Sequence, residues 1–195
     1  MKRKALPWTV LFFASGCSVV KEARVVDDWA TVDKDVIKRI AVVVAPHPGG
    51  VEAAGKAVAR LARRYVHMKR EFIVLADTSA TQAPSLTESC EGGRDAVLTL
   101  ALKATPQTGG FTLEAKGQLL RCKDGREEWS GSAGGSFRSD DSGLTEVAQN
   151  YAREFGEEAK PFIAPAMNLL RPLLDTLPNP TLLDADVEDK MSSDE

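Results

Sequence analysis

The stretch Ile37-Lys38-Arg39-Ile40-Ala41-Val42-Val43-Val44-Ala45 contains a continuous run, Ile40 to Val44, that is rich in β-branched residues, and Pro46-His47-Pro48-Gly49-Gly50 follows it directly. An uninterrupted apolar run of this kind is typical of a strand that is buried on both faces, as in a parallel sheet. The prolines and glycines after it favour a loop. The sequence therefore predicts a central, buried strand from Ile37 to Ala45.

A helix is predicted after this loop, from Val51 to about Lys69, because apolar residues recur there at steps of three and four. Those residues are Val51, Ala54, Val58, Leu61, Ala62, Tyr65 and Met68. The segment Phe72-Ile73-Val74-Leu75 then predicts a second short strand. A strand, a helix and a strand in this order form a right-handed crossover, which places the two strands parallel.

Three segments of alternating apolar and polar residues follow a loop from Asp77 to Arg94 that is rich in Ser, Thr, Pro and Gly. They span residues 95–104, 111–121 and 127–137, with the period of two that half-buried strands require. The pair Asp124-Gly125 supplies the positive backbone angles of a tight hairpin. These segments predict a three-stranded antiparallel meander with one buried face.

A long apolar helical stripe runs from Leu144 to Leu177, after the capping residues of Ser139-Asp140-Asp141-Ser142. Three prolines interrupt it, at Pro161, Pro165 and Pro172. Because proline removes a backbone donor, we expect a break or kink near Lys160. The fold class is therefore α/β (α+β): a strand-helix-strand crossover, a three-stranded antiparallel meander and a long, kinked C-terminal helix packed on one sheet.

The amino-terminal residues have the pattern of a bacterial secretory signal. Met1-Lys2-Arg3-Lys4 is basic, Ala5 to Ala14 is apolar, and Ser15-Gly16-Cys17 places small residues before a cysteine. This pattern predicts cleavage after Gly16 and a diacylglyceryl group, with chains such as palmitate, on Cys17. The uncharged Ser18 favours an outer-membrane lipoprotein that faces the periplasm, although the inner membrane and the cell surface remain open.

Two other interpretations of this segment are an ordinary signal peptide and an uncleaved anchor. The apolar stretch of about ten residues is shorter than the twenty or so that cross a bilayer. Acyl chains on Cys17 would contribute about 0.8 kcal/mol per buried methylene, so a multiply acylated cysteine would hold the protein on a membrane unaided.

The chain divides into four predicted parts. Residues 1–16 form the signal peptide, and residues 17–36 form a lipid-anchored tether that docks partly on the domain through Trp29. Residues 37–178 form a single α/β domain. The acidic residues 179–195 are expected to be disordered, because almost no apolar residue follows Val187.

Three cysteines are present, and lipid would consume Cys17, which leaves Cys90 and Cys122 as an even pair. In an oxidising compartment such a pair predicts a disulfide, and two free buried thiols are the alternative. His47 and His67 are the only histidines, and neither has the spacing of a metal ligand set. No metal and no cofactor are expected.

Several segments carry a resemblance to known proteins. The relevant residues are Val32-Asp33-Lys34 to Ala45-Pro46, Ala59 to Phe72, and the layout from Cys17 to Leu177. They resemble a family of uncharacterised bacterial lipoproteins known mainly from myxobacteria and leptospires, which has no established activity. More distantly, Asp95-Ala96-Val97-Leu98 and Asp124 to Gly131 are similar to the TolB N-terminal domain and CsgG-type lipoproteins, and this likeness implies a fold and no function.

Charge excludes one class of partner. Without Lys2, Arg3 and Lys4 the chain keeps 22 basic against 28 acidic residues, a net charge of −6. Nucleic-acid binding needs a basic face, so it is not expected. The concentrated positive surface is on the predicted helix, at Lys56, Arg60, Arg63 and Arg64. It would meet anionic headgroups or an acidic partner, or it is simply a solvated helix face.

No catalytic motif accompanies these features. His47 follows the first strand, where open α/β sheets bind ligands, but a loop histidine in a rigid turn has the same sequence. We therefore expect no enzyme, and instead a non-enzymatic accessory or structural component of an outer-membrane or periplasmic assembly. The alternative is a small-ligand or lipid-binding periplasmic carrier, with a pocket between the sheet and the final helices lined by Leu170, Leu174 and Trp129.

Overall fold

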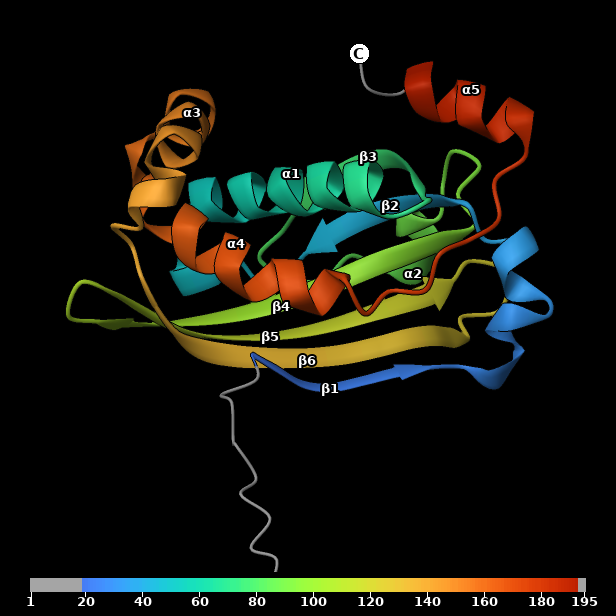
Figure 1. Ribbon diagram of the computed structural model, residues 1–195, viewed down its shortest axis with the longest axis horizontal. Helices are drawn as coiled ribbons and strands as arrows, with labels where there is room; N and C mark the ends of the chain where they lie inside the picture. Colours follow the sequence, from blue (N-terminus) through green and yellow to red (C-terminus); the bar gives the residue numbers. More distant parts are fainter. Residues whose placement is uncertain (1–18, 193–195) are drawn as a thin grey trace, which may run out of the picture.

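The computed structural model describes residues 19–192 and contains one six-stranded mixed sheet, with the strand order β1-β6-β5-β4-β2-β3 (Figure 1). The strands are β1 Val20–Val25, β2 Arg39–Val44, β3 Ile73–Ser79, β4 Ala96–Gln107, β5 Gly110–Arg121 and β6 Glu127–Arg138. The helices are α1 Glu52–Lys69, α2 Leu86–Ser89, α3 Thr145–Phe155, α4 Lys160–Leu174 and α5 Asp184–Ser192.

The predicted crossover and meander are both confirmed. Strand β2 is parallel to β3 on one side and to β4 on the other, with Val42 opposite Asp77 and Leu98. Strands β4, β5 and β6 are consecutive and antiparallel. The apolar run of β2 is buried because the strand has neighbours on both edges and α1 packs over it.

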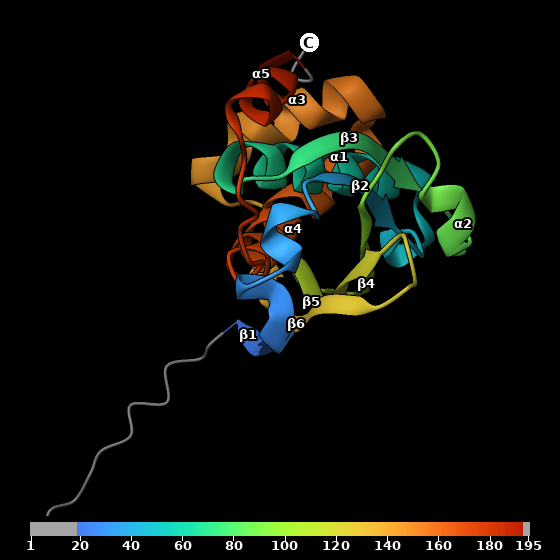
Figure 2. The ribbon, with the colours of Figure 1, turned by 90° about the vertical axis from the view of Figure 1, so that its right-hand side faces the viewer.

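Helices α1 and α4 pack against the same face of the sheet, whereas α2 lies on the other side (Figures 1 and 2). The predicted break near Lys160 is confirmed, because α3 ends at Phe155, the next residue Gly156 has a φ of 107°, and a 3-10 turn over Glu157–Ala159 leads into α4. A positive φ of this size is accessible to glycine and strained for other residues. The long apolar stripe is thus two helices.

Trp129, on β6, is the largest fully buried side chain among residues 19–192 and lies on the helix-covered face, near Leu173 of α4. Its ring crosses Gly117 and Gly131 on neighbouring strands, where a Cβ atom would approach ring carbons to 2.7 Å. Its indole Nε1 donates to Thr176 Oγ1 at 3.1 Å. Leu170 and Leu174 are fully buried in the same core. Core side chains therefore fill the place where the sequence predicts a carrier pocket, and that predicted location is wrong.

The predicted tether over residues 17–36 is wrong from Val20 onward. Residues Val20–Val25 form β1, an edge strand antiparallel to β6. The sequence did not predict this strand because its charged residues resemble those of a solvent-exposed linker. Charged residues are common on edge strands, where they prevent pairing with another chain. Trp29 is buried, as expected, in a 3-10 turn that follows β1.

The predicted disorder of residues 179–195 is wrong for Asp184–Ser192, which form α5. Lys38 Nζ donates to Asp186 Oδ2 at 2.6 Å, and Arg39 pairs with Asp189. At the other end of α5, Lys190 Nζ donates to the carbonyl oxygen of Arg70 at 2.8 Å. Ion pairs and hydrogen bonds with residues far away in the sequence, rather than apolar burial, therefore hold α5 on the domain.

The docking of α5 should depend on pH. The hydrogen bond from Lys38 Nζ, followed by one from the Leu183 N–H, lowers the pKa of Asp186 below its usual value. A carboxylate with a lowered pKa in the folded state stabilises that state above its unfolded pKa of about 3.9, and this contribution disappears as pH falls through the folded value. We expect NMR signals of α5 to report docking at pH 5 to 7 and progressive release as pH falls below the unfolded pKa of about 3.9.

A matched pair of variants checks that prediction. Asp186→Asn should release α5 already at pH 7, because the amide no longer carries the charge that Lys38 requires. Asp184→Asn, an exposed residue in the same turn, should leave the helix docked. Release in both variants, or in neither, would show that the Lys38–Asp186 pair does not hold α5.

The predicted signal peptide and Cys17 lie outside the described residues. Among residues 19–192, no helix has the length and apolar character to span a membrane.

Candidate binding groove on the open sheet face

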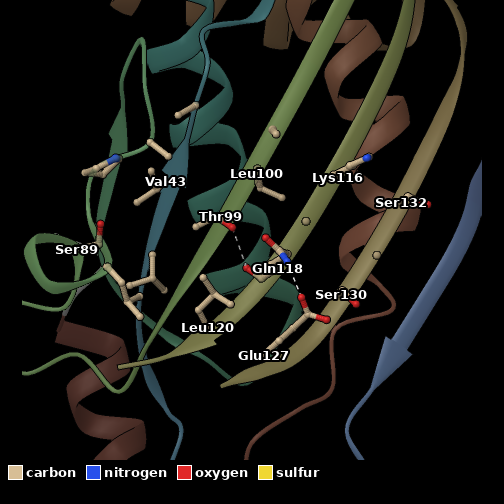
Figure 3. A pocket seen from close by; sticks show the side chains of 18 of the residues that line it. Val43, Ser89, Thr99, Leu100, Lys116, Gln118, Leu120, Glu127, Ser130 and Ser132 are labelled. Carbon is tan, nitrogen blue, oxygen red and sulfur yellow. Dashed lines mark hydrogen bonds between the residues drawn. The ribbon is translucent and has the colours of Figure 1, made fainter. Parts of the chain in front are cut away.

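A groove of about 630 Å³ lies on the sheet face that α1 and α4 leave uncovered (Figure 3). Strands β4, β5 and β6 form its floor, and the segment around α2 forms one wall. Glu22 of the edge strand β1 also lines it. The groove therefore extends across the meander to the amino-terminal strand.

The floor is polar because these strands alternate. Their apolar residues point into the core, so the residues between them face the groove. Those residues are Thr99, Lys116, Gln118, Ser130 and Ser132. Thr99 Oγ1 donates to the Gln118 carbonyl oxygen at 3.4 Å, and Gln118 Nε2 donates to Glu127 Oε2 at 2.5 Å. Figure 3 shows these side chains on three adjacent strands.

The wall is apolar and held in place. Val97 is buried beneath the α2 segment, and Pro84 and Leu86 from that segment face the groove. A disulfide joins Cys90, just after α2, to Cys122, just after β5, with the two Cα atoms 5.6 Å apart. The predicted disulfide is therefore present, and it ties the wall of the groove to its floor.

A capping box fixes the start of α2. Ser85 Oγ accepts from the Glu88 N–H at 3.3 Å, and the Ser85 N–H donates to Glu88 Oε2 at 3.0 Å. The Ser85 hydroxyl also donates to Glu88 Oε2 at 2.9 Å, and this bond, followed by the one from the Ser85 N–H, lowers the pKa of the Glu88 carboxyl. Arg94 Nη1 also donates to the Ser89 carbonyl oxygen at 2.8 Å. The wall is therefore an ordered element and a suitable surface for recognition.

The groove offers hydrogen-bond donors and acceptors beside an apolar wall, together with the charges of Lys116, Glu22 and Glu127. Its lining residues include no histidine and no cysteine. In the part of the chain that the structure describes, no group of three His, Cys, Asp or Glu residues has the arrangement of a metal site. This chemistry suits binding by shape and hydrogen bonds.

The predicted basic face on α1 lies on the helix side of the sheet, away from this groove. Its four cations have acidic neighbours that the sequence did not indicate. Lys56 pairs with Glu52, Arg60 and Arg63 pair with Asp77, and Arg60 and Arg64 pair with Glu154. Internal carboxylates therefore compensate much of the positive charge.

His47 lies in the loop between β2 and α1, next to the cis peptide bond Ala45–Pro46. Its Nδ1 atom is buried, and so is Ser79 Oγ, and neither has a hydrogen-bond partner among residues 19–192. A Cβ atom at Gly55 would lie 2.3 Å from this nitrogen, so a glycine is required there. The arrangement is a tightly packed turn.

Sequence reasoning missed the groove, although part of its signal was visible. The polar residues of the three alternating strands indicated which face was not buried, and they include Thr99, Gln118, Ser130 and Ser132. The apolar wall was not visible, because its residues come from a segment that looked like an irregular loop.

The fold and the groove together define a mixed α/β domain with one helix-covered and one open sheet face. No protein-family model matches the chain, and no curated protein matches it either. The predicted membership of a myxobacterial lipoprotein family therefore stays a prediction.

Two solved structures illustrate what the chain is similar to. One is the PelC dodecamer from Paraburkholderia phytofirmans, with 17% identity over 72% of this chain and 89% of that chain, and a TM-score of 0.39. The other is the lipoprotein GNA1162 from Neisseria meningitidis, with 22% identity over 60% of this chain and 96% of that chain, and a TM-score of 0.40. At these values the likeness says nothing about function.

Proposed function

We propose that this chain is a lipid-anchored envelope lipoprotein that acts by binding, as a non-enzymatic accessory component of an outer-membrane or periplasmic assembly. In this proposal Cys17 carries the lipid, and the groove on the open sheet face contacts the partner protein. The membrane is the outer one, and the domain faces the periplasm.

One observation supports this proposal above the others, namely that β1 begins at Val20. Only two residues separate Cys17 from it, and a chain spans at most about 3.6 Å per residue. A lipid on Cys17 would thus hold the edge of the sheet within about 10 Å of the bilayer. Because Glu22 of β1 lines the groove, the groove would lie beside the membrane.

The disulfide and the lining of the groove give further support. A bridge between Cys90 and Cys122 suits an oxidising compartment such as the periplasm. The groove combines neutral hydrogen-bonding side chains with an apolar wall, which is a composition typical of recognition surfaces. Its floor lies on rigid strands, so little conformational entropy would be lost on binding.

A crosslinking experiment in cells tests this proposal. A photoreactive residue in place of Gln118, on the groove floor, should crosslink to one discrete envelope protein. The matched control is the same residue in place of Glu146, an exposed position on α3. The Gln118 product should disappear when Cys17→Ser removes the anchor. Equal products from both positions, or none from Gln118, would contradict the proposed binding surface.

A second candidate function is a small-ligand carrier. The volume of the groove, about 630 Å³, favours it, because small-molecule sites usually measure about 300–1,000 Å³. Native mass spectrometry of protein purified from the envelope distinguishes the two candidates. A carrier would retain a bound small molecule, and Leu120→Glu on the groove floor would release it.

A further inference from the structure

We infer that a second groove, between α1, α3 and α4, binds a single-chain anionic amphiphile, that is, an apolar chain with a carboxylate or phosphate head. This groove measures about 410 Å³ and lies on the helix side of the molecule. It shares no residue with the groove on the sheet face. The inference is therefore independent of the proposed function.

The interior of this helix groove is apolar and deformable. Its apolar lining consists of Leu61, Tyr65, Met68, Val147, Tyr151 and Met167. Met68 is 70% exposed, although it belongs to the apolar stripe of α1. Unbranched methionine side chains adapt to different occupants, which is why they are frequent on binding surfaces. An apolar chain laid here would cover Met68.

The charged residues of the helix groove are all positive. Arg64, Lys69 and Arg171 line it, and no aspartate or glutamate does. Arg64 pairs with Glu154 at 3.6 Å and lies over the Tyr151 ring, 5.3 Å from its centroid. Within residues 19–192, Lys69 and Arg171 take part in no ion pair, so two cations are available for an anionic head.

Two carboxylates that contact lining residues of this groove are already engaged. Glu154 pairs with Arg60 as well as Arg64. Asp175 accepts a hydrogen bond from the Tyr65 hydroxyl at 2.6 Å. Burial, together with this hydrogen bond, raises the pKa of Tyr65 to about 12, so the phenol stays neutral at physiological pH. The electrostatic environment therefore favours an anion and disfavours a cation.

The size of the groove favours an amphiphile over an acidic helix. A single pocket of about 410 Å³ is in the range of small-molecule sites, whereas a docked helix requires anchors over several turns. Cations at the rim and apolar side chains within match a charged head and one chain. The occupant is therefore a lipid-like anion rather than a protein.

Methionine methyl groups report on this site selectively. The four methionines are Met1, Met68, Met167 and Met191. Met68 and Met167 line the helix groove, whereas Met191 lies on α5. The full chain with Cys17→Ser, labelled with ¹³C at the methionine methyls, is titrated with dodecanoate and dodecyl phosphate below their micelle concentrations. The signals of Met68 and Met167 should shift and saturate, while the signal of Met191 stays in place.

Charge selectivity is tested with a probe and a pair of variants. Dodecyltrimethylammonium, which has the same chain and the opposite charge, should bind at least about tenfold more weakly, which corresponds to about 1.4 kcal/mol. Met68→Glu should weaken dodecanoate binding by a similar factor, followed through Met167. Met191→Glu, at a residue that is 72% exposed, is the matched control and should leave binding unchanged.

Three results would overturn the inference. The first is an equal response to the cationic and anionic probes, which would show that the cations play no part. The second is an absence of saturable shifts at Met68 and Met167. The third is a response to an acidic amphipathic peptide and to neither anionic amphiphile, which would make this face a protein-docking surface.

Discussion

Replacing Asp33 by alanine should lower the free energy of unfolding by about 3 kcal/mol, because removal of one partner from a buried ion pair typically costs about 3–5 kcal/mol. Asp33 has no exposed side-chain surface. Its Oδ1 accepts from Arg121 Nη1 at 3.0 Å, and its other oxygen pairs with Arg126. The lower end of the range applies because both guanidinium groups keep some contact with solvent.

The effect is large because Asp33 joins two distant parts of the chain. It lies in a second 3-10 turn, Asp33–Asp35, between β1 and β2, whereas Arg121 and Arg126 flank the hairpin between β5 and β6. Glu128, which is also fully buried, pairs with both arginines and would stay in place. The variant would therefore keep its sheet, including β1, and lose the link between the turn at Asp33 and the hairpin between β5 and β6.

Urea denaturation measures this change, with Asp35→Ala as the control. Asp35 is an exposed carboxylate in the same turn, so its loss should change stability by less than about 0.5 kcal/mol. Equal stability of the Asp33→Ala variant and the unaltered protein would show that the buried carboxylate contributes nothing to the fold.

Loss of the disulfide should have a similarly large effect. Cys90 and Cys122 are separated by 32 positions, and closing a loop of that size stabilises a fold by about 4 kcal/mol in the chain-entropy treatment. The double variant Cys90→Ser, Cys122→Ser should therefore unfold at a clearly lower urea concentration. Hydrogen exchange should rise most in the α2 wall of the sheet groove, which the disulfide attaches to β5.

A comparison of oxidised and reduced protein provides the second half of this test. Reduction should destabilise the unaltered protein and leave the double variant unchanged. A reduced protein as stable as the oxidised one would mean that other contacts of the α2 segment, such as its capping box, hold it in place.

The central elements were predictable because their signals are local. The apolar run of β2, the helical period of α1 and the alternation of β4 to β6 depend on neighbouring residues only. The break before α4 was predictable in part, since Pro161 lies in the first turn of α4, whereas Pro165 and Pro172 lie inside this helix and do not end it. Where one face of a helix or strand is buried, the spacing of its apolar residues indicates which of the two it forms.

Elements that depend on partners far away in the sequence were not predictable. Strand β1 and helix α5 carry few apolar residues, so composition indicated a tether and a disordered tail. Lys38 pairs with Asp186 across 148 positions of sequence, and Arg121 pairs with Asp33 across 88. One sequence does not show which of its 53 charged residues will meet.

The candidate site was predictable only in part, because some of its elements also depend on residues that are distant in the sequence. The basic residues of α1 were visible, but their partners Asp77 and Glu154 lie on other elements. The groove on the sheet face depends on the α2 segment, which folds over β4 and has no periodic signal of its own. The position of this groove is therefore set by tertiary contacts and not by a local sequence pattern.

The proposed function depends most directly on the modification of Cys17, and one measurement tests it. The intact mass of the protein purified from membranes should correspond to a chain that begins at Cys17 and carries acyl groups. The Cys17→Ser variant should lack that mass and leave the membrane fraction. A mature protein that begins at another residue without acyl mass, or a variant that stays bound to the membrane, would contradict the account.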